Sequence, residues 1–144
     1  MAIKNYTSKV PSVRSLAEIQ EELAMHGATK IMTDYEGGKA TGITFGIEVN
    51  GVTAGFRITA DVDGVLAVFK KQNVKPDREQ AERTAWRNVH DWIMAQMAFV
   101  ECGNAKMEEV FLPYLTDGKT TLYQSFKEGQ LPLPAYNGGY LTEG

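Results

Sequence analysis

The clearest pattern of apolar and polar positions lies between residues 41 and 59, where the two types alternate along the chain. Alternation with a period of two is typical of strands that bury one face. Asn50-Gly51 interrupts the pattern and favours a two-residue hairpin turn, because both of its residues can take the positive φ angles that such a turn needs. We therefore predict two antiparallel strands, over about 41–49 and 52–59.

A two-residue turn also determines which residues of the two strands face each other. Phe45 then pairs with Phe56, and Gly46 pairs with Gly55. Eight apolar residues share one face, where each large side chain contributes roughly 1.5–3 kcal/mol when buried. They are Ile43, Phe45, Ile47, Val49, Val52, Ala54, Phe56 and Ile58.

The opposite face of this hairpin carries the two glycines beside Arg57. Facing glycines weaken a sheet but leave a shallow trough, in which a ligand or another backbone can approach closely. We predict that Gly46 and Gly55 form such a close-approach surface. Simple tolerance of small residues on an exposed face is the alternative.

The residues before this hairpin predict a helix and one more strand. Ser15 to Glu18 has the spacing of a capping box, which predicts a helix over about 16–26. A strand over about 30–35 turns at Gly37-Gly38. A two-residue loop would place Met32 on the apolar face, and a three-residue loop with a bulge would place Ile31, Thr33 and Tyr35 there.

Helical periodicity and capping signals predict the elements after the hairpin. The expected helices run over about 62–72 after Asp61, over about 78–101, from a cap at Asn104, and from Thr120 or Thr121 to about Lys127. The order predicts an α+β fold: an N-terminal helix, a three-stranded antiparallel sheet (a β-meander), then a long helix and shorter C-terminal helices packed on one sheet face. We expect a single domain over 1–128 and a Pro/Gly-rich tail over 129–144.

Composition narrows the class of protein. The chain has 144 residues, a net charge of −3 and a single cysteine, Cys102, which we expect to be a buried thiol. No apolar run is long enough to cross a membrane, and no signal peptide is evident, so we expect a cytoplasmic protein without a membrane partner.

Charge is unevenly distributed despite the acidic total. Residues 70–87 hold six cations against three acids, whereas the rest of the chain is acidic. With Arg57, these cations predict a phosphate-contacting strip, and Trp86 offers a stacking surface for a base. The predicted ligand-binding residues are Arg57, Lys70, Lys71, Lys75, Arg83, Trp86 and Arg87. Solvated helix surface, ion pairs within the helix and a core position for Trp86 are the alternatives.

The second half of the long helix is apolar nearly all round, from Trp92 to Val100. A helix that is apolar on every side must be covered on every side. We therefore predict an interface of a homo-oligomer, made of Trp92, Ile93, Met94, Met97, Phe99 and Val100. Burial by the C-terminal helices of the same chain is the alternative.

Catalytic and metal-binding signals are weak. His26 and His90 are far apart, and neither has a metal-ligand spacing with Cys102, so we expect helix-surface or capping roles for both histidines. No phosphate-binding glycine motif precedes a helix. We predict a protein that is not an enzyme and needs no cofactor or metal.

Three segments resemble a family of short, uncharacterised proteins of bacteriophages and mobile elements: residues 5–10, 81–87 and 109–114. The resemblance implies a phage or prophage accessory protein in a bacterial host, without an assigned activity. The element order looks like the core of phage single-strand annealing proteins. We expect a protein that binds single-stranded nucleic acid in recombination, annealing or replication. The alternatives are an oligomeric inhibitor of bacterial immunity, which captures a nucleotide signal or blocks a host protein, and a non-catalytic interaction module.

Overall fold

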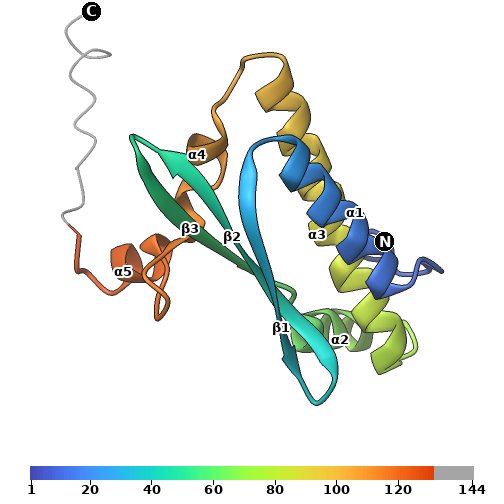
Figure 1. The fold of residues 1–144 in the computed structure, drawn as a ribbon. Coiled ribbons are helices and arrows are strands. Elements are labelled where there is room, and N and C mark those ends of the chain that lie inside the picture. Colours follow the sequence, from blue (N-terminus) through green and yellow to red (C-terminus); the bar gives the residue numbers. More distant parts are fainter. Residues whose placement is uncertain (132–144) are drawn as a thin grey trace, which may run out of the picture.

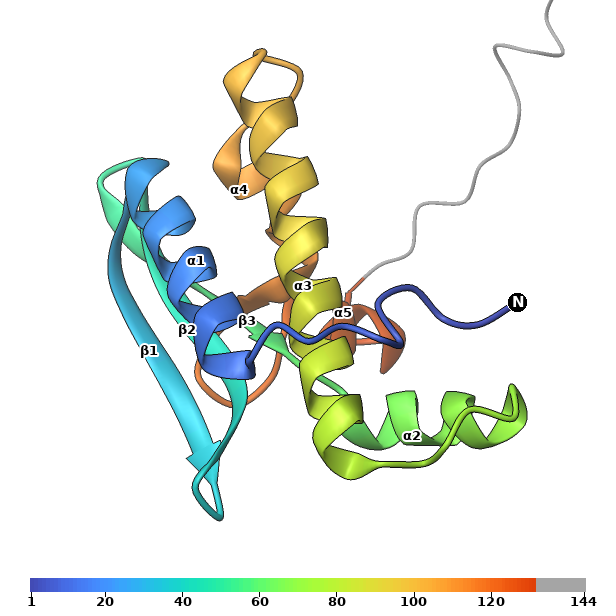
Figure 2. The same cartoon turned by 90° about the vertical axis from the view of Figure 1, so that its right-hand side faces the viewer.

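A computed structural model describes residues 1–131 and confirms the α+β fold. One antiparallel sheet has the strand order β1-β2-β3-β4, and α1 and α3 run side by side along one of its faces (Figures 1 and 2). The strands are β1 (Ala28–Glu36), β2 (Lys39–Val49), β3 (Val52–Thr59) and β4 (Leu115–Thr116). The helices are α1 (Ser12–Met25), α2 (Val62–Lys71), α3 (Arg78–Glu101), α4 (Met107–Val110) and α5 (Leu122–Lys127), with a 3₁₀ helix η1 at Leu112–Tyr114. Most of the expected tail, residues 132–144, lies outside the described part of the chain.

The central hairpin has the register that the sequence predicts. Phe45 pairs with Phe56 and Gly46 with Gly55. The turn residues Asn50 and Gly51 take φ angles of 53° and 79°, as the turn requires. A register error of one residue would expose the apolar face, so this pairing organises the whole sheet.

The first hairpin combines both predicted alternatives. Its turn has two residues, Gly37 and Gly38, but a bulge between Asp34 and Tyr35 shifts the register of β1. Ile31 therefore pairs with Phe45 and Thr33 with Ile43, as the bulged alternative predicts, and Met32 is 59% exposed. The same alternative was wrong for Tyr35, which lies beyond the bulge and is 66% exposed. Because of the bulge, the hairpin can have a two-residue loop and still place Ile31, instead of Met32, on the apolar face.

Capping predictions were right for α2 and α5 and wrong for α1 and α4. The carboxylate of Asp61 accepts a hydrogen bond from Gly64 N at 2.9 Å, and Thr121 caps α5. Helix α1 begins at Ser12, one turn before the expected start, and Ser15 is a buried residue inside it. Lys106, rather than Asn104, precedes α4.

The two-residue strand β4 was missed. It pairs with Gly55 and Phe56 of β3, and its Thr116 also forms an isolated bridge with Thr121. Two residues are too short for an alternating pattern to be visible in the sequence. Beyond Phe56, no strand among the described residues pairs with the outer edge of β3.

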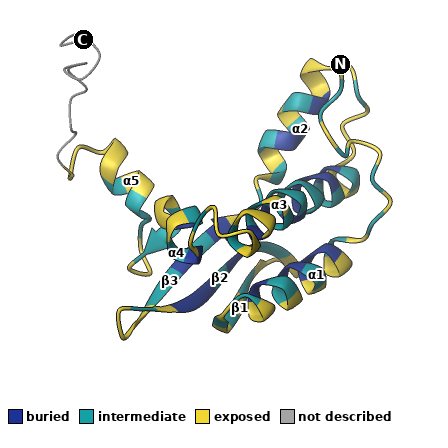
Figure 3. Cartoon of the chain, turned by 90° about the horizontal axis from the view of Figure 1, so that it is seen from above, coloured by how far each residue is buried: buried dark blue, intermediate teal, exposed yellow. Residues whose placement is uncertain are grey.

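The main core fills the space between the sheet and the two long helices. β2 carries a nearly continuous run of buried residues (Figure 3). The buried cluster combines Leu16, Ile19 and Leu23 of α1, Ile43, Phe45, Ile47, Phe56 and Ile58 of β2 and β3, Trp86, Ile93 and Met97 of α3, and the later residues Met107 and Phe111. Of the eight residues predicted for the apolar face, Val49 and Ala54 are partly buried and Val52 is 67% exposed. A smaller cluster joins α2 to the first turns of α3.

This core overturns part of the predicted oligomer interface. Ile93 is 0% exposed and Met97 is 1% exposed, because both side chains point into the core of their own chain. Trp92 packs edge-on against Phe111 and Tyr114. Burial within the chain therefore accounts for Ile93 and Met97, whereas Trp92 is partly covered by the C-terminal residues Phe111 and Tyr114.

Phe99, at 51% exposed, is the most exposed residue of the predicted interface, and Met94 and Val100 are half-buried. Among the described residues, no helix is long and apolar enough to span a membrane.

Candidate ligand-binding cleft

The side of α3 that faces α1 is occupied by the N-terminal segment and by an ion-pair network. Residues 3–10 cross α3 before α1 begins (Figure 2). Arg83 donates to the carbonyl oxygen of Ser8 through Nε at 3.2 Å, and to Gln80 Oε1 through Nη2 at 2.6 Å. Its guanidinium thus fastens the N-terminal segment to the helix.

Arg87, one turn further along α3, is held in the same way. Its Nη1 donates to Glu18 Oε1 at 3.2 Å and to Ser15 Oγ at 3.4 Å, and its Nε lies 3.8 Å from Asp91 Oδ1. The Arg87 side chain is 21% exposed. Ser15 and Glu18, the residues that resemble a capping box, therefore bind α3 instead of capping α1.

His90 extends this network into the interior. It is 7% exposed, which corrects the surface or capping role expected from the sequence. Its Nε2 lies 2.8 Å from Glu18 Oε1, and its Nδ1 lies 2.8 Å from Asp91 Oδ1. Hydrogen bonds from Arg14 and Arg87 lower the pKa of Glu18 against the opposing effect of burial, so this carboxylate stays ionised between its cationic neighbours.

Trp86 is a core residue, and its predicted stacking role is wrong. It is 1% exposed, and its Nε1 donates to the carbonyl oxygen of Ala40 at 3.2 Å. A base cannot stack on a ring that the sheet and α1 already cover.

A cavity of about 720 Å³ lies beside Arg83, between α1, α3 and the β1–β2 turn. Charges of both signs line it: Lys9, Lys39 and Arg83 against Glu79 and Glu82. Lys39 Nζ lies 3.6 Å from Glu82 Oε2, so part of this charge is neutralised within the chain. We refer to this cavity as the α1-side cavity.

The three predicted lysines lie elsewhere. Lys70 and Lys71 end α2, and Lys75 is in the loop that follows. All three are exposed, and none lines the α1-side cavity or the cleft described next. Lys70 and Lys71 suit the negative end of the α2 dipole, which accounts for cations at this position without a ligand.

The opposite side of α3 borders a larger cleft. It has a volume of about 1010 Å³ and is lined by β3, α3 and the segment from η1 to α5. We call it the β3–α3 cleft. Its charged and aromatic lining residues are Arg57, Trp92, Tyr114, Lys119 and Tyr123, and Asn88, Thr116, Thr120, Thr121 and Gln124 add polar groups.

Arg57 of β3 is one of the lining residues, and its guanidinium is paired across the sheet with Asp34 of β1. Its Nη1 lies 2.8 Å from Asp34 Oδ2, and its side chain is 39% exposed. Asp34 Oδ2 is buried and has no hydrogen-bond partner among the described residues, so this ion pair provides its charge compensation. A guanidinium has five N–H donors, and one carboxylate orients it without using them all.

Lys119 supplies the second cation, on the loop between β4 and α5. Its side chain is in no ion pair among the described residues. The neighbouring Asp117 accepts hydrogen bonds from the backbone N–H of Lys119 and of Thr120, at 2.9 and 3.0 Å. These two bonds, that of Thr120 first, lower the pKa of Asp117 and direct its carboxylate into the loop.

The lining of the β3–α3 cleft, within the described chain, contains no Asp or Glu. Lys119 carries a charge that no ion pair among the described residues neutralises, and Arg57 keeps N–H donors beyond its pair with Asp34, so the cleft can attract an anion even though the whole chain is acidic. Sequence reasoning found Arg57 but missed Lys119, Tyr114 and Tyr123. Lys119 and Tyr123 lie near a predicted helix start, which was the only sequence signal for them. Short loops and 3₁₀ turns have no periodicity from which a position beside β3 could be predicted.

The glycine pair does not form an open trough. Gly46 and Gly55 face each other as the register predicts, but Gly46 is buried. The methyl group of Thr53 lies only 2.9 Å from the position of a Cβ on Gly46. Gly55 lies beside Thr116 of β4, so the small residues at this point accommodate side chains of the same chain.

No family model, no curated protein and no solved structure matches this chain. The resemblance to phage and mobile-element proteins therefore stays a prediction, and the function must be argued from the cleft itself.

Proposed function

We propose that this protein binds single-stranded nucleic acid, and that the β3–α3 cleft holds it. The observation that carries the proposal is the charge of the lining: Arg57 and Lys119 with no carboxylate among the lining residues. Phosphate contacts from Arg and Lys supply most of the affinity of proteins that bind nucleic acid without sequence specificity. In this proposal Arg57 and Lys119 contact the phosphates, instead of the cations of residues 70–87.

Aromatic side chains of the cleft support a ligand with bases. Trp92 and Tyr114 meet edge to face, with ring centroids 5.6 Å apart, and Tyr123 is 55% exposed. Stacking of a base on an aromatic ring is worth roughly 1–3 kcal/mol and tolerates every base. Tyr123 and the accessible part of Trp92 take over the role that the sequence suggested for Trp86.

The unpaired edge of β3 and the size of the cleft support an extended ligand. Arg57, Ile58 and Thr59 line the cleft at an edge that β4 leaves open. Small-molecule pockets have volumes of about 300–1,000 Å³, so this cleft is at the upper end of that range. In the setting that the resemblance implies, we propose an accessory role in phage recombination, annealing or replication.

Fluorescence anisotropy with a labelled oligothymidylate at low salt tests the proposal. We expect saturable binding by the wild-type chain. Lys119→Gln should weaken it about tenfold, since one charged phosphate contact is lost. The pair Asp34→Asn/Arg57→Gln should weaken it less than Lys119→Gln does, because it removes the N–H donors of Arg57 but leaves the net charge unchanged and leaves no uncompensated buried charge at Asp34. Lys127→Gln, on α5 but outside the cleft lining, is the matched control and should bind as the wild type does.

Three results would contradict the proposal. One is an absence of oligonucleotide binding even at low salt, and another is equal loss of affinity in Lys119→Gln and Lys127→Gln. The third is a rise in melting temperature with cyclic nucleotides but not with oligonucleotides, which favours capture of a nucleotide signal. If neither ligand changes stability, the chain is better explained as an interaction module.

A further inference from the structure

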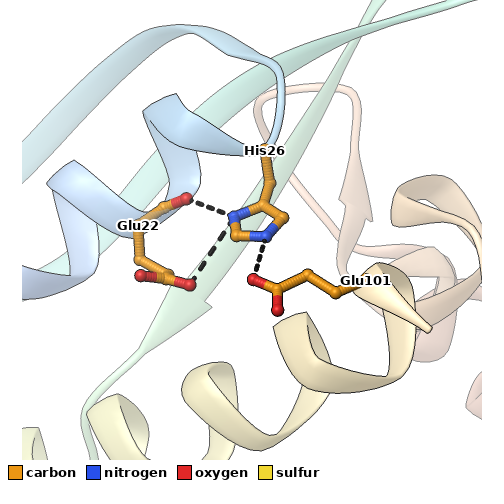
Figure 4. A group of neighbouring side chains, drawn as sticks. All are labelled: Glu22, His26 and Glu101. Atoms are coloured by element: carbon orange, nitrogen blue, oxygen red, sulfur yellow. Dashed lines mark hydrogen bonds and ion pairs between the residues drawn. The ribbon is translucent and has the colours of Figure 1, made fainter.

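We propose that Glu22, His26 and Glu101 form a zinc-binding site at the place where the C-terminal ends of α1 and α3 meet. One ligand atom from each residue can be chosen so that all three lie within 4.8 Å of one another. Figure 4 shows the imidazole of His26 between the two carboxylates. The site lies outside the β3–α3 cleft and does not depend on the proposed function.

The imidazole is oriented as a metal ligand requires. Nδ1 of His26 lies 2.8 Å from the carbonyl oxygen of Glu22, to which it can only donate. This hydrogen bond leaves Nε2 to face Glu101 Oε1 at 2.9 Å. Metal-ligating histidines commonly donate their other ring N–H to a carbonyl or carboxylate, which fixes the tautomer and the ring orientation.

Either a second ring proton or a metal ion must therefore lie between Nε2 and the carboxylate of Glu101. When Nδ1 carries the proton, neutral Nε2 is a hydrogen-bond acceptor, and two acceptors at 2.9 Å repel each other. A second proton on the ring or a metal ion between the two atoms removes the repulsion. The carboxylate of Glu22 lies on the Nδ1 side of the ring, with Oε1 3.6 Å from Nδ1, so its side chain would turn toward Nε2 to complete the ligand set.

The surroundings favour a divalent cation. Two helix C-termini, each with a partial negative charge, converge here, and neither α1 nor α3 has a basic residue in its last turn. A cavity of about 430 Å³ adjoins His26, and its charged lining residues are Glu48, Glu108 and Lys106. Among the described residues that surround the site, acids thus outnumber cations.

The ligand types are compatible with zinc. Zinc binds both imidazole nitrogens and carboxylate oxygens, and sites with three protein ligands leave a fourth position for water. Zinc bonds of about 2.0–2.1 Å place tetrahedral ligand atoms roughly 3.3 Å apart, so the three ligand atoms, now within 4.8 Å of one another, must move closer together. Glu101 can make this change easily because its side chain is 64% exposed. The adjoining cavity gives water access to the open position.

Calorimetric titration of the full chain with zinc sulfate, in a buffer free of chelators, tests the site. We expect one zinc ion per chain and a higher melting temperature in the presence of zinc. His26→Gln should weaken binding at least about tenfold. Glu101→Gln should also weaken it, and because Glu101 is exposed, this variant tests the site even if His26→Gln is unstable.

Two controls separate this site from adventitious binding. Glu36→Gln removes an exposed acid of β1 and should leave the affinity for zinc unchanged. Cys102, which is exposed rather than buried as the sequence suggested, lies next to Glu101, and Cys102→Ser should also bind as the wild type does. An absence of zinc binding by the wild type, unchanged affinity in both Glu101→Gln and His26→Gln, or loss of binding in Cys102→Ser would overturn the proposal.

Discussion

The two sides of α3 differ in what their charges contact. On the α1 side, Arg83 and Arg87 contact carbonyl oxygens, hydroxyls and carboxylates of their own chain. On the β3 side, Arg57 meets one carboxylate, and Lys119 meets none among the described residues. The side with more arginines is therefore the structural one. A count of cations along a sequence does not reveal the available charge, because pairing within the chain decides it.

Reversing a charge in the β3–α3 cleft should produce the largest change. Lys119→Glu removes one cation and places a carboxylate in a lining without acids, so oligonucleotide affinity should fall by about 30-fold or more. The fold should persist, because Lys119 is exposed. Anisotropy at constant low salt measures the affinity. A loss of less than threefold would mean that the cleft is not the binding surface.

Replacing Arg87 should lower the stability of the fold and leave oligonucleotide affinity unchanged. Arg87→Gln leaves the half-buried carboxylate of Glu18 and the buried hydroxyl of Ser15 without this donor, so the free energy of unfolding should fall by about 1–3 kcal/mol. Affinity for the oligonucleotide should not change. Urea unfolding and anisotropy on the same sample check both parts. Weaker binding without loss of stability would show that Arg87 contacts the ligand, and would contradict a purely structural role for the α1 side of α3.

The salt dependence of oligonucleotide binding should distinguish the two sides of α3. Each cation that contacts a phosphate of a single strand adds roughly 0.7 to the negative slope of log affinity against log salt. Lys119→Gln should therefore reduce the slope by about 0.7, whereas Arg83→Gln should leave it unchanged. Anisotropy titrations at several salt concentrations give the slopes. Equal slopes for Lys119→Gln and the wild type would contradict a phosphate contact at Lys119.

The smallest expected effect is on the folding stability at acidic pH, and it involves Asp91 on the α1 side of α3. Burial tends to raise the pKa of Asp91, but hydrogen bonds from Asn5, His90 and Lys4 outweigh it, and the pKa is lowered below its usual value of 3.8. A lowered carboxyl pKa contributes stability that is present above pH 3.8 and is lost as pH falls through the folded-state pKa.

Asp91→Asn should therefore destabilise the protein at neutral pH and show a smaller further loss than the wild type below about pH 4. Thermal unfolding at several pH values measures the difference. A parallel decline of both proteins through the acid range would show that Asp91 does not anchor the N-terminal segment.

Local patterns predicted most of the fold. The turn at Asn50-Gly51 and the alternation around it gave the strand pairing, and Asp61 and Thr121 marked two helix starts. Each of these signals is contained in a few neighbouring residues. The strand β4 and the early start of α1 were missed, because they depend on contacts with distant parts of the chain.

The sites were harder to predict for the same reason. Ser15 and Glu18 have the spacing of a helix cap, and the same spacing places both on the face of α1 that meets Arg87. Only the packing of α1 on α3 distinguishes these two uses. Likewise, Glu22 and His26 are one helical turn apart in the sequence, but Glu101 joins them only in the folded chain.

The two tryptophans of the chain provide the most direct test, since each lies on a different side of α3. Trp92 lines the β3–α3 cleft, whereas Trp86 is buried and donates its Nε1 hydrogen to Ala40. In a ¹⁵N-correlated NMR spectrum, Trp92→Phe assigns the two indole signals. Titration with oligothymidylate should then shift the Trp92 signal and leave that of Trp86 in place. A shift confined to Trp86, or no shift of either signal at saturation, would contradict binding in the β3–α3 cleft.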